Sequence, residues 1–533
     1  MKVHNHMAKS TDVVALLKAC AIRKDLLKGS LLHAEIVRTS SFGTDVFVGS
    51  ALVNMYVKCG ALIQAHETFS KLTGPNIVAW NALITGYAQY GRGKEALHCF
   101  EQMCHDGIRP DAVTLASIFK ACGTIGAVEK GHEICLQFAI HGLPQKDTVV
   151  GTALVDMYAK CGMLQRAEEL FNGLAVRNII SWTALLGGFV QHGCNEEALV
   201  YLDLMEEEGI SPNAITFVCV LKACTSIHSF NRGQIIHVEI SRRSLLKEEG
   251  ISTALVDMYC KCGLIGKAEE VFRERHRQNV ESWNALISGY AQTGVGMRAL
   301  DCFKCMQNEA FSPDAITFSC LLKACSSIGA WHKGQELHSQ IYVGGFTKNN
   351  ISLSMGLIDM YAKFGIPEKA ERVFESVNMK DLLSWNAVLS GYAQSGEHDK
   401  VFELFVRMIG EGEEPDSATF VSILTACNHY GLLDEGQICF EIMSMIYNII
   451  PSREHHACLI DLLSRVGRVD KAVVIAMDMP FAMNLAVCHM LMGACQKEKD
   501  TNLGLVIFHH VIQLDDDDSG AHICMRNIFA DNC

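Results

Sequence analysis

The chain has 533 residues, of which 49% are hydrophobic and 20% charged, and it contains only 9 prolines. This composition excludes a disordered chain and favours a packed helical one. The formal net charge of −13 excludes a protein that binds nucleic acid through unspecific positive charge. No clean apolar run of about 20 residues occurs, so we predict no membrane insertion.

The chain begins with a short segment, residues 1–10, that lacks the Arg-rich and Ser-rich character of a transit peptide. From residue 11 onward the sequence repeats itself. Four of the five tryptophans stand in near-identical strings, such as SWNALISGYAQTG and SWNAVLSGYAQSG. These residues are Trp80, Trp182, Trp283 and Trp385. A position that is copied at a fixed spacing indicates a repeat protein.

Each unit, of about a hundred residues, divides into three related segments. A second string ends in LKAC or a variant, and a third reads ALVDMYAKCG or a variant. Cutting the chain at equivalent residues gives fourteen segments over residues 11–484, with lengths of 35 or 36, 31 and 35 residues in rotation. The segment at 453–484 is slightly longer than its equivalents.

Each segment is predicted to form two helices. In segment 77–111 the apolar residues follow the i, i+3, i+4, i+7 pattern of an amphipathic helix, namely Trp80, Leu83, Ile84 and Tyr87. Gly91 ends this helix, a second apolar run follows, and Pro110 blocks its continuation. One hairpin of this size cannot bury its own apolar face. We therefore predict an all-α fold, a right-handed superhelical solenoid of helix-turn-helix hairpins.

Eight of the 23 cysteines stand at positions that recur once per unit, in the LKAC and KCG strings. Such a residue is more often a small core residue than a metal ligand. Phe364 replaces the fourth cysteine of the KCG set, which a packing position tolerates and a ligand set does not. We expect no metal and no cofactor. Because no signal peptide is evident, we expect a reducing compartment and no disulfide framework.

The strings WNALISGYAQ, ITFSCLLKACSSIGA and TALVDMYAKCG recur in register and resemble the plant pentatricopeptide repeat (PPR) family. More closely they resemble its PLS subclass, whose P-type, L-type and S-type repeats alternate. The rival tetratricopeptide repeat has a uniform period of about 34 residues. The resemblance implies a PPR array of fourteen repeats in L-S-P rotation over residues 11–484.

Residues 485–533 resemble an E-type motif followed by a partial second E-type motif. Cys488 stands where the E-type motif usually has tryptophan. The chain opens on an L-type repeat and stops inside an E-type motif, so both ends are expected to be incomplete.

The resemblance implies binding of single-stranded RNA at about one base per repeat. In the family, the fifth and the last residue of a repeat read the base edge. These pairs are Ser50/Asn76, Asn81/Asp111, Thr152/Asn178, Thr183/Asn213, Thr253/Asn279, Asn284/Asp314 and Asn386/Asp416, beside the uncodable Met355/Asp381. With the family code, Thr or Ser with Asn implies adenine and Asn with Asp implies uracil. The expected target is A-U-x-A-A-x-A-U-x-x-U. The alternative is that these polar residues only cap helices.

Two further sets follow from the resemblance. The second residue of a repeat sandwiches bases, which implies this role for Phe47, Val78, Val149, Ile180 and Leu383. Gly250, Glu281 and Ser352 depart from that pattern. The thirteenth residue of the S-type repeats contacts RNA phosphate, which implies this role for Lys58, Lys160, Lys261 and Lys363. The alternative is a solvated helix end, where the helix dipole favours a cation.

Some members of the family end in a zinc deaminase domain, which needs H-x-E followed by P-C-x-x-C. His33-Ala34-Glu35 and His237-Val238-Glu239 match the first half, but no P-C-x-x-C follows. The C-x-x-C at Cys302 and Cys305 lacks the proline. The sequence therefore predicts no catalytic residues and no enzyme.

The expected function is that of a sequence-specific, single-stranded RNA-binding adaptor in organellar RNA processing. The expected process is C-to-U RNA editing, with a deaminase-bearing PPR protein or another editing factor recruited in trans. The alternative is a protein-binding helical-repeat scaffold, or a decayed paralogue without an RNA target. The family resides mostly in the mitochondrion or the chloroplast, and of these we favour the mitochondrion.

Overall fold

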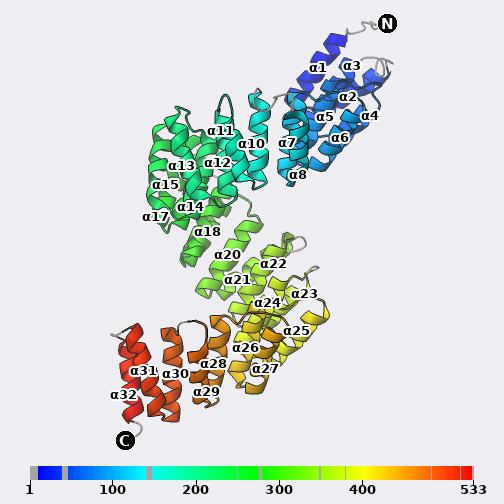
Figure 1. The fold of residues 1–533 in the computed structure, drawn as a ribbon. Helices are drawn as coiled ribbons and strands as arrows, with labels where there is room; N and C mark the ends of the chain where they lie inside the picture. The colour runs from blue at the N-terminus through cyan, green and yellow to red at the C-terminus, as the bar shows by residue number, and fades with distance from the viewer. Residues whose placement is uncertain are drawn as a thin grey trace. The chain divides into compact units, whose positions relative to one another are not determined.

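The computed structural model describes residues 10–38, 46–139, 147–248, 250–274, 279–346, 350–377, 380–481, 483–515 and 518–530. Within these ranges the chain forms helices and no strand. Figure 1 shows the helices following one another as antiparallel pairs. The chain groups into two compact units, Met1–His276 and Arg277–Cys533.

The first unit is built from helical hairpins. These are α1 (Ser10–Arg23) with α2 (Leu26–Arg38), α3 (Val46–Lys58) with α4 (Leu62–Ser70), α5 (Ile77–Gln89) with α6 (Gly93–His105), α7 (Ala112–Ile125) with α8 (Val128–Ala139), α10 (Thr148–Lys160) with α11 (Leu164–Asn172), α12 (Ile179–Gln191) with α13 (Asn195–Glu207), α14 (Ala214–Ser226) with α15 (Phe230–Arg242), and α16 (Ile251–Lys261) with α17 (Ile265–Glu274). A 3-10 helix, η1 (Leu245–Lys247), follows α15.

The second unit continues in the same way. Its hairpins are α18 (Val280–Gln292) with α19 (Gly296–Asn308), α20 (Ala315–Ile328) with α21 (Trp331–Val343), α22 (Ile351–Lys363) with α23 (Pro367–Glu375), α24 (Leu382–Ser395) with α25 (His398–Gly410), α26 (Ser417–Tyr430) with α27 (Leu433–Met445), α28 (Arg453–Arg465) with α29 (Val469–Asp478), and α30 (Leu485–Glu498) with α31 (Thr501–Leu514). The helix α32 (Ser519–Ala530) ends the described chain.

Within each unit the first helix of a hairpin packs on its own second helix and on the first helices of the neighbouring hairpins. Thus α5 contacts α3, α6 and α7, and α24 contacts α22, α25 and α26. This is the stacking that a solenoid requires, because each hairpin buries its apolar face against its neighbours. The predicted all-α hairpin solenoid is confirmed. The division into L-type, S-type and P-type repeats stays a prediction.

The recurring tryptophans fill the space between successive hairpins. Trp182 is 1% exposed and Trp385 is fully buried. Each meets a phenylalanine of the preceding second helix edge to face: the ring centroids of Phe171 and Trp182 lie 4.6 Å apart, as do those of Phe374 and Trp385. This geometry is favourable for aromatic pairs. The tryptophan therefore recurs because one hairpin interface in each three-hairpin unit repeats the same pocket.

The first helices approach one another closely at a glycine within the tryptophan string. A Cβ added to Gly188 of α12 would lie 2.4 Å from the Cβ of Ala159 and 3.0 Å from its Cα, in α10. Backbone atoms cannot move aside as a flexible side chain can. A larger residue at this position would push neighbouring hairpins apart.

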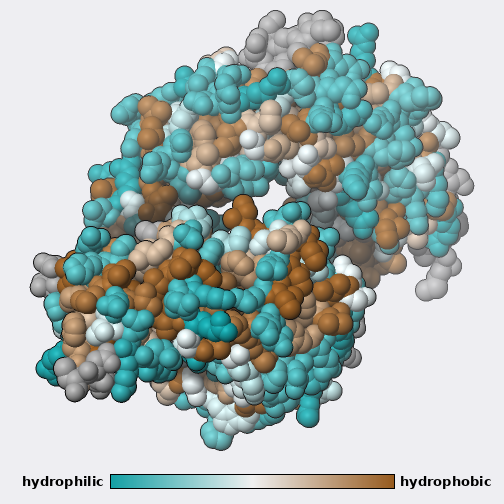
Figure 2. All heavy atoms as spheres, turned by 60° about the horizontal axis from the view of Figure 1, so that its bottom comes forward, coloured by the Kyte–Doolittle hydropathy of each residue, from teal (hydrophilic) through white to brown (hydrophobic). Residues whose placement is uncertain are grey.

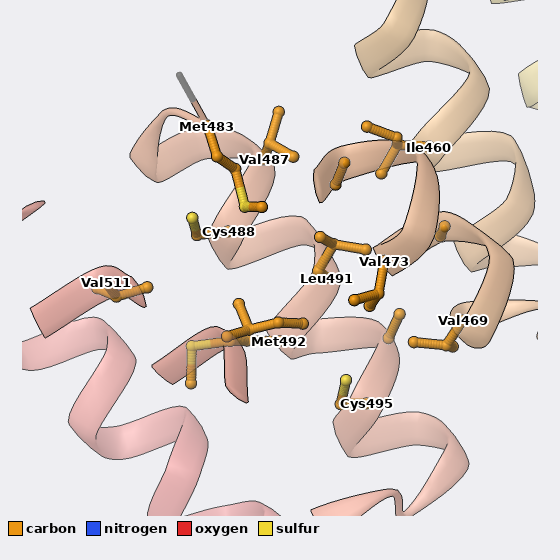
Figure 3. Packing of buried hydrophobic residues seen from close by; sticks show 14 of the residues in the cluster. Ile460, Val469, Val473, Met483, Val487, Cys488, Leu491, Met492, Cys495 and Val511 are labelled. Atoms are coloured by element: carbon orange, nitrogen blue, oxygen red, sulfur yellow. The ribbon is translucent and has the colours of Figure 1, made fainter. Parts of the chain in front are cut away.

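The C-terminal helices belong to the same continuous core. Figure 3 shows Cys488, Leu491, Met492 and Cys495 of α30 packed beside side chains of α28 and α29. Cys488 is fully buried, and burial raises the pKa of its thiol to about 11. Helix α32 packs on α30 and α31, as the first helix of a following hairpin would. In the described residues, no helix is both long and apolar enough to span a membrane.

Replacing Trp385 by alanine should empty the pocket between α22, α24 and the ring of Phe374. We expect a loss of about 3–5 kcal/mol of local stability, as for other buried aromatic-to-alanine changes. Because coupling in a solenoid is between neighbours, hydrogen exchange should accelerate mainly in α22 to α26. The control is Tyr342→Ala, at a side chain that is 74% exposed. Equal exchange in both variants would contradict this account of the core.

Candidate nucleic-acid interface

The predicted base-reading residues come from two adjoining places in the fold. The fifth residue of a segment lies near the start of a first helix, as Asn81 does in α5. The last residue is the N-cap of the next first helix, as Asp111 is for α7. Because successive first helices pack side by side, the two residues of a pair can meet within one unit.

The three Asn/Asp pairs share one geometry. The Asn81 Nδ2 atom donates to both carboxylate oxygens of Asp111, at 3.0 Å each. In the second unit, Asn284 Nδ2 lies 3.0 and 3.1 Å from the Asp314 oxygens. Asn386 Nδ2 lies 2.9 Å from Asp416 Oδ1. The same polar pair is therefore built three times, each time across the interface between two hairpins.

The pairs with a hydroxyl residue are more varied. The hydroxyl of Ser50 lies 3.0 Å from Asn76 Oδ1. Thr183 reaches Asn213 only through Thr216, whose hydroxyl lies 2.9 Å from that of Thr183 and 3.0 Å from Asn213 Oδ1.

The two remaining threonines differ from both arrangements. Among the described residues, the Thr152 hydroxyl and the Thr253 hydroxyl have no hydrogen-bond partner. Asn178 accepts instead from the backbone N–H groups of Ile180 and Ser181. Thr253 belongs to the first unit and Asn279 to the second, where Asn279 caps α18.

The last residues of these pairs also cap helices, as the alternative interpretation requires. The capping side chains are Asn76, Asp111, Asn178, Asn213, Asn279, Asp314, Asp381 and Asp416. In the Asn81/Asp111 pair, Asp111 Oδ1 accepts from the backbone N–H of Thr114, and both carboxylate oxygens also face Asn81. Capping and pairing are therefore compatible functions of one side chain.

The carboxylates of the Asn/Asp pairs are held in their charged form. Partial burial by itself would raise the pKa of Asp111. Hydrogen bonds from the Thr114 backbone N–H and from the Asn81 amide are the main contributions that outweigh burial and lower the pKa below its ordinary value. The pKa values of Asp314 and Asp416 are lowered by the corresponding bonds. At neutral pH each carboxylate therefore only accepts hydrogen bonds.

The predicted base-sandwiching residues lie exposed at the second position of their helices. The exposed fraction is 75% for Phe47 and between 57% and 65% for Val78, Val149, Ile180 and Leu383. Figure 2 shows apolar side chains exposed among hydrophilic ones on the face it presents. These side chains are exposed at one register of several first helices and add nothing to the core.

Sequence reasoning missed three residues of the same kind. Val113, Ile215 and Ile316 are 53%, 63% and 62% exposed and occupy the second position of α7, α14 and α20. Their register in the repeat was the available signal.

One cavity brings all three predicted sets together. It has a volume of about 340 Å³ and lies between α10, α12 and α14. Its walls include the pair Thr183 and Asn213, the apolar Ile180 and Ile215, and Lys160. The cavity thus brings hydrogen-bonding side chains together with two exposed apolar side chains, and the Lys160–Asp156 ion pair is also part of its lining.

The predicted phosphate-contacting lysines each end a first helix: α3, α10, α16 and α22. Three of them are ion-paired one turn back along the helix. The nitrogen–oxygen distances are 2.7 Å for Lys160–Asp156, 3.0 Å for Lys261–Asp257 and 2.8 Å for Lys363–Asp359. Three of the four lysines that we expected to be single cations are therefore in ion pairs. Their aspartate partners stand four residues earlier, a spacing that is visible in the sequence. In the case of Lys58, the residue four positions earlier is Asn54, which is uncharged.

The histidines of the H-x-E strings are part of the packing. His33 Nδ1 lies 2.8 Å from the hydroxyl of Tyr56, and His237 Nδ1 lies 2.7 Å from that of Tyr259. Burial lowers the pKa of both imidazoles. His338 makes the same bond to Tyr361. Across the described ranges, no group of three or more His, Cys, Asp or Glu residues is placed to hold a metal ion.

The sequence of the chain matches known families and proteins. The PPR repeat family model matches residues 75–124, 177–226, 278–327 and 380–429, and the PPR repeat model matches 152–179, 251–274 and 355–381. A chloroplastic pentatricopeptide repeat-containing protein of Arabidopsis thaliana is 32% identical over 96% of this chain and 63% of its own length. A mitochondrial one from the same plant is 31% identical over 98% of this chain and 76% of its own length.

Solved structures show the same fold. The crystal structure of the pentatricopeptide repeat protein PPR10 from maize superposes with a TM-score of 0.60 at 18% identity, over 98% of this chain and 86% of that one. PPR10 in complex with an 18-nt psaJ RNA element superposes with a TM-score of 0.55 at 16% identity, over 97% of this chain and 89% of that one. The family matches and the curated relatives together establish that the chain belongs to the pentatricopeptide repeat family.

Proposed function

We propose that this chain is a sequence-specific, single-stranded RNA-binding adaptor for organellar RNA processing. The observation that carries the proposal is the cavity at Thr183 and Asn213, where hydrogen-bonding side chains, exposed apolar side chains and Lys160 meet. A base can stack between Ile180 and Ile215 while its edge faces the polar pair. PPR10 is known in complex with an 18-nt psaJ RNA element, which supports the same role here.

The chemistry of the pairs gives the proposed selectivity. In an Asn/Asp pair, one N–H of the amide faces the carboxylate, so a second N–H and an oxygen lone pair remain for a base. This donor and acceptor fit the edge of uracil. A Thr/Asn pair has a smaller fifth residue, which leaves room for adenine. The proposed target is therefore A-U-x-A-A-x-A-U-x-x-U.

The charge of the chain favours specific over unspecific binding. With a net charge of −13 and most of the helix-end lysines paired to aspartates, long-range attraction to phosphates is weak. Binding must then depend on the base contacts. Lys58 has no ion pair among the described residues and is the strongest candidate in its row for a phosphate contact.

We further propose that the chain acts in C-to-U editing with a deaminase supplied in trans. The support is the resemblance of its repeats to the PLS subclass and of residues 485–533 to an E-type motif followed by a partial second one. The helices α30, α31 and α32 lie within this range. The relatives include chloroplastic and mitochondrial proteins, and the mitochondrion remains our preferred location. The chain spans about 58–76% of the length of these curated relatives, so the activity of the whole protein is part of the proposal.

The purified protein should bind RNA containing A-U-x-A-A-x-A-U-x-x-U more tightly than a scrambled RNA of the same composition. Each mismatched base should cost on the order of 1 kcal/mol, so several mismatches should lower the affinity by orders of magnitude. Fluorescence anisotropy at near-physiological salt measures this. Equal affinity for both RNAs would instead favour a protein-binding scaffold or a decayed paralogue.

Exchanging one pair should change one base. In the double variant Asn81→Thr with Asp111→Asn, the preference at the second nucleotide should move from uracil to adenine, because the pair acts on a single base edge. The same change at Asn284 and Asp314, whose geometry is equivalent, should move only the eighth nucleotide. An unchanged preference for uracil at the second nucleotide would mean that residues and bases are misaligned.

The pure chain should bind its RNA without deaminating it. The H-x-E histidines are bonded to tyrosines, and the chain has no P-C-x-x-C string to complete a zinc site. Incubation with RNA that carries a cytidine a few nucleotides 3′ of the element, followed by sequencing, should show conversion only after a deaminase protein is added. Conversion by the pure chain, with stoichiometric zinc, would identify an enzyme instead.

A further inference from the structure

Four threonines occupy the third position of α7, α14, α20 and α26 and are fully buried: Thr114, Thr216, Thr317 and Thr419. None belongs to a base-reading pair. Each nevertheless reaches back to the fifth residue of the preceding first helix. The hydroxyls of Thr114, Thr317 and Thr419 lie 2.5–2.6 Å from the Oδ1 atoms of Asn81, Asn284 and Asn386. We name these three the bridging threonines.

The direction of the bridging bond follows from counting protons. The Thr114 hydroxyl accepts from the backbone N–H of Asp111 at 3.3 Å and has one proton to donate. Asp111 Oδ1 already accepts from the Thr114 backbone N–H and from Asn81 Nδ2. Asn81 Oδ1 is 2.5 Å from the hydroxyl, compared with 2.9 Å for Asp111 Oδ1. The proton therefore goes to Asn81.

The asparagine amide is thus held at both ends. Its nitrogen faces an ionised carboxylate, which only accepts, and its oxygen faces a hydroxyl that donates. Rotating the amide by half a turn would place its oxygen against the carboxylate oxygens, which is repulsive. One N–H and one oxygen lone pair then remain, and their directions are fixed.

We propose that the bridging threonines are positioning residues that set the uracil selectivity of the preceding repeat. This inference rests on the proposed function, because it assigns the orientation of the reading amide to a residue of the next repeat. Selectivity by hydrogen bonds requires a donor and an acceptor that cannot exchange places. Without the hydroxyl, the amide can rotate about its side-chain bonds, and it then fits cytosine as well as uracil.

The third position of other first helices supplies a matched control. In α12 that residue is Ser181, whose hydroxyl bonds to the backbone N–H and the carbonyl of its own N-cap, Asn178. The reading residue before it, Thr152, has an unpartnered hydroxyl, so Ser181 makes no bridge. Both side chains are buried and both complete a capping box. Thr114 and Ser181 differ in that the Thr114 hydroxyl contacts the preceding reading residue, whereas the Ser181 hydroxyl bonds to its own N-cap.

The test uses the full chain and four RNAs that differ only in the second nucleotide. With the native protein we expect about a tenfold preference for uracil over cytosine there. Thr114→Val, which keeps the shape but loses the hydroxyl, should reduce this ratio to about two or less. Thr114→Ser should restore it, and Ser181→Ala should leave it unchanged. Full uracil preference in Thr114→Val, or an equal loss of affinity for all four RNAs, would overturn the inference.

A second measurement does not depend on RNA binding. Crystal structures of Thr114→Val and Thr317→Val should show the amides of Asn81 and Asn284 turned away from their native orientation, and Thr114→Ser should keep it. Unchanged amides in the valine variants would overturn the positioning role. If the native protein failed to discriminate among the RNAs, the proposed function would fail, while the amide orientations would still decide whether the threonines position them.

Discussion

The spacing of the polar pairs and of the exposed apolar residues depends on one interaction. It is the hydrogen bond between an N-cap side chain and the first turn of the helix that it caps. It fixes the residue at which most of the described first helices begin, as Asp111 does for α7, whereas α16 begins after Gly250 without such a bond. Once the start is fixed, the second residue points outward and the fifth lies against the cap of the following hairpin. Exposed apolar residues and polar pairs then recur at one spacing because the first helices with an Asn or Asp cap start in the same way.

Much of this fold could be predicted from the sequence, because periodicity reports which faces are buried. The recurring tryptophans, the helix-ending glycines and the polar residue before each first helix locate the hairpins. The packing role of the recurring cysteines could also be predicted. In the structure, burial raises the pKa of thiols such as Cys122 to about 12, which suits a packing residue and not a reactive thiolate. The register of the pairs was equally accessible, because a repeat places equivalent residues at equivalent positions.

The sequence could not predict contacts between different hairpins that involve a third residue. Thr114 lies 33 positions after Asn81, and its hydroxyl is indistinguishable in the sequence from a simple capping residue. The exposure of Val113 and Ile215 depends on how two hairpins stack, which no local pattern reports. The pairing of Lys160 with Asp156 was visible at the i, i+4 spacing.

The distribution of cysteines has a practical consequence. Of the described cysteines, Cys104 in α6 and Cys305 in α19 are the exposed ones, and both lie near the end of a second helix, away from the polar pairs. One belongs to each compact unit. Brief treatment with a maleimide dye pair will favour these two thiols over the buried ones. Energy transfer between the dyes then reports the separation of the two units in solution, with RNA present or absent.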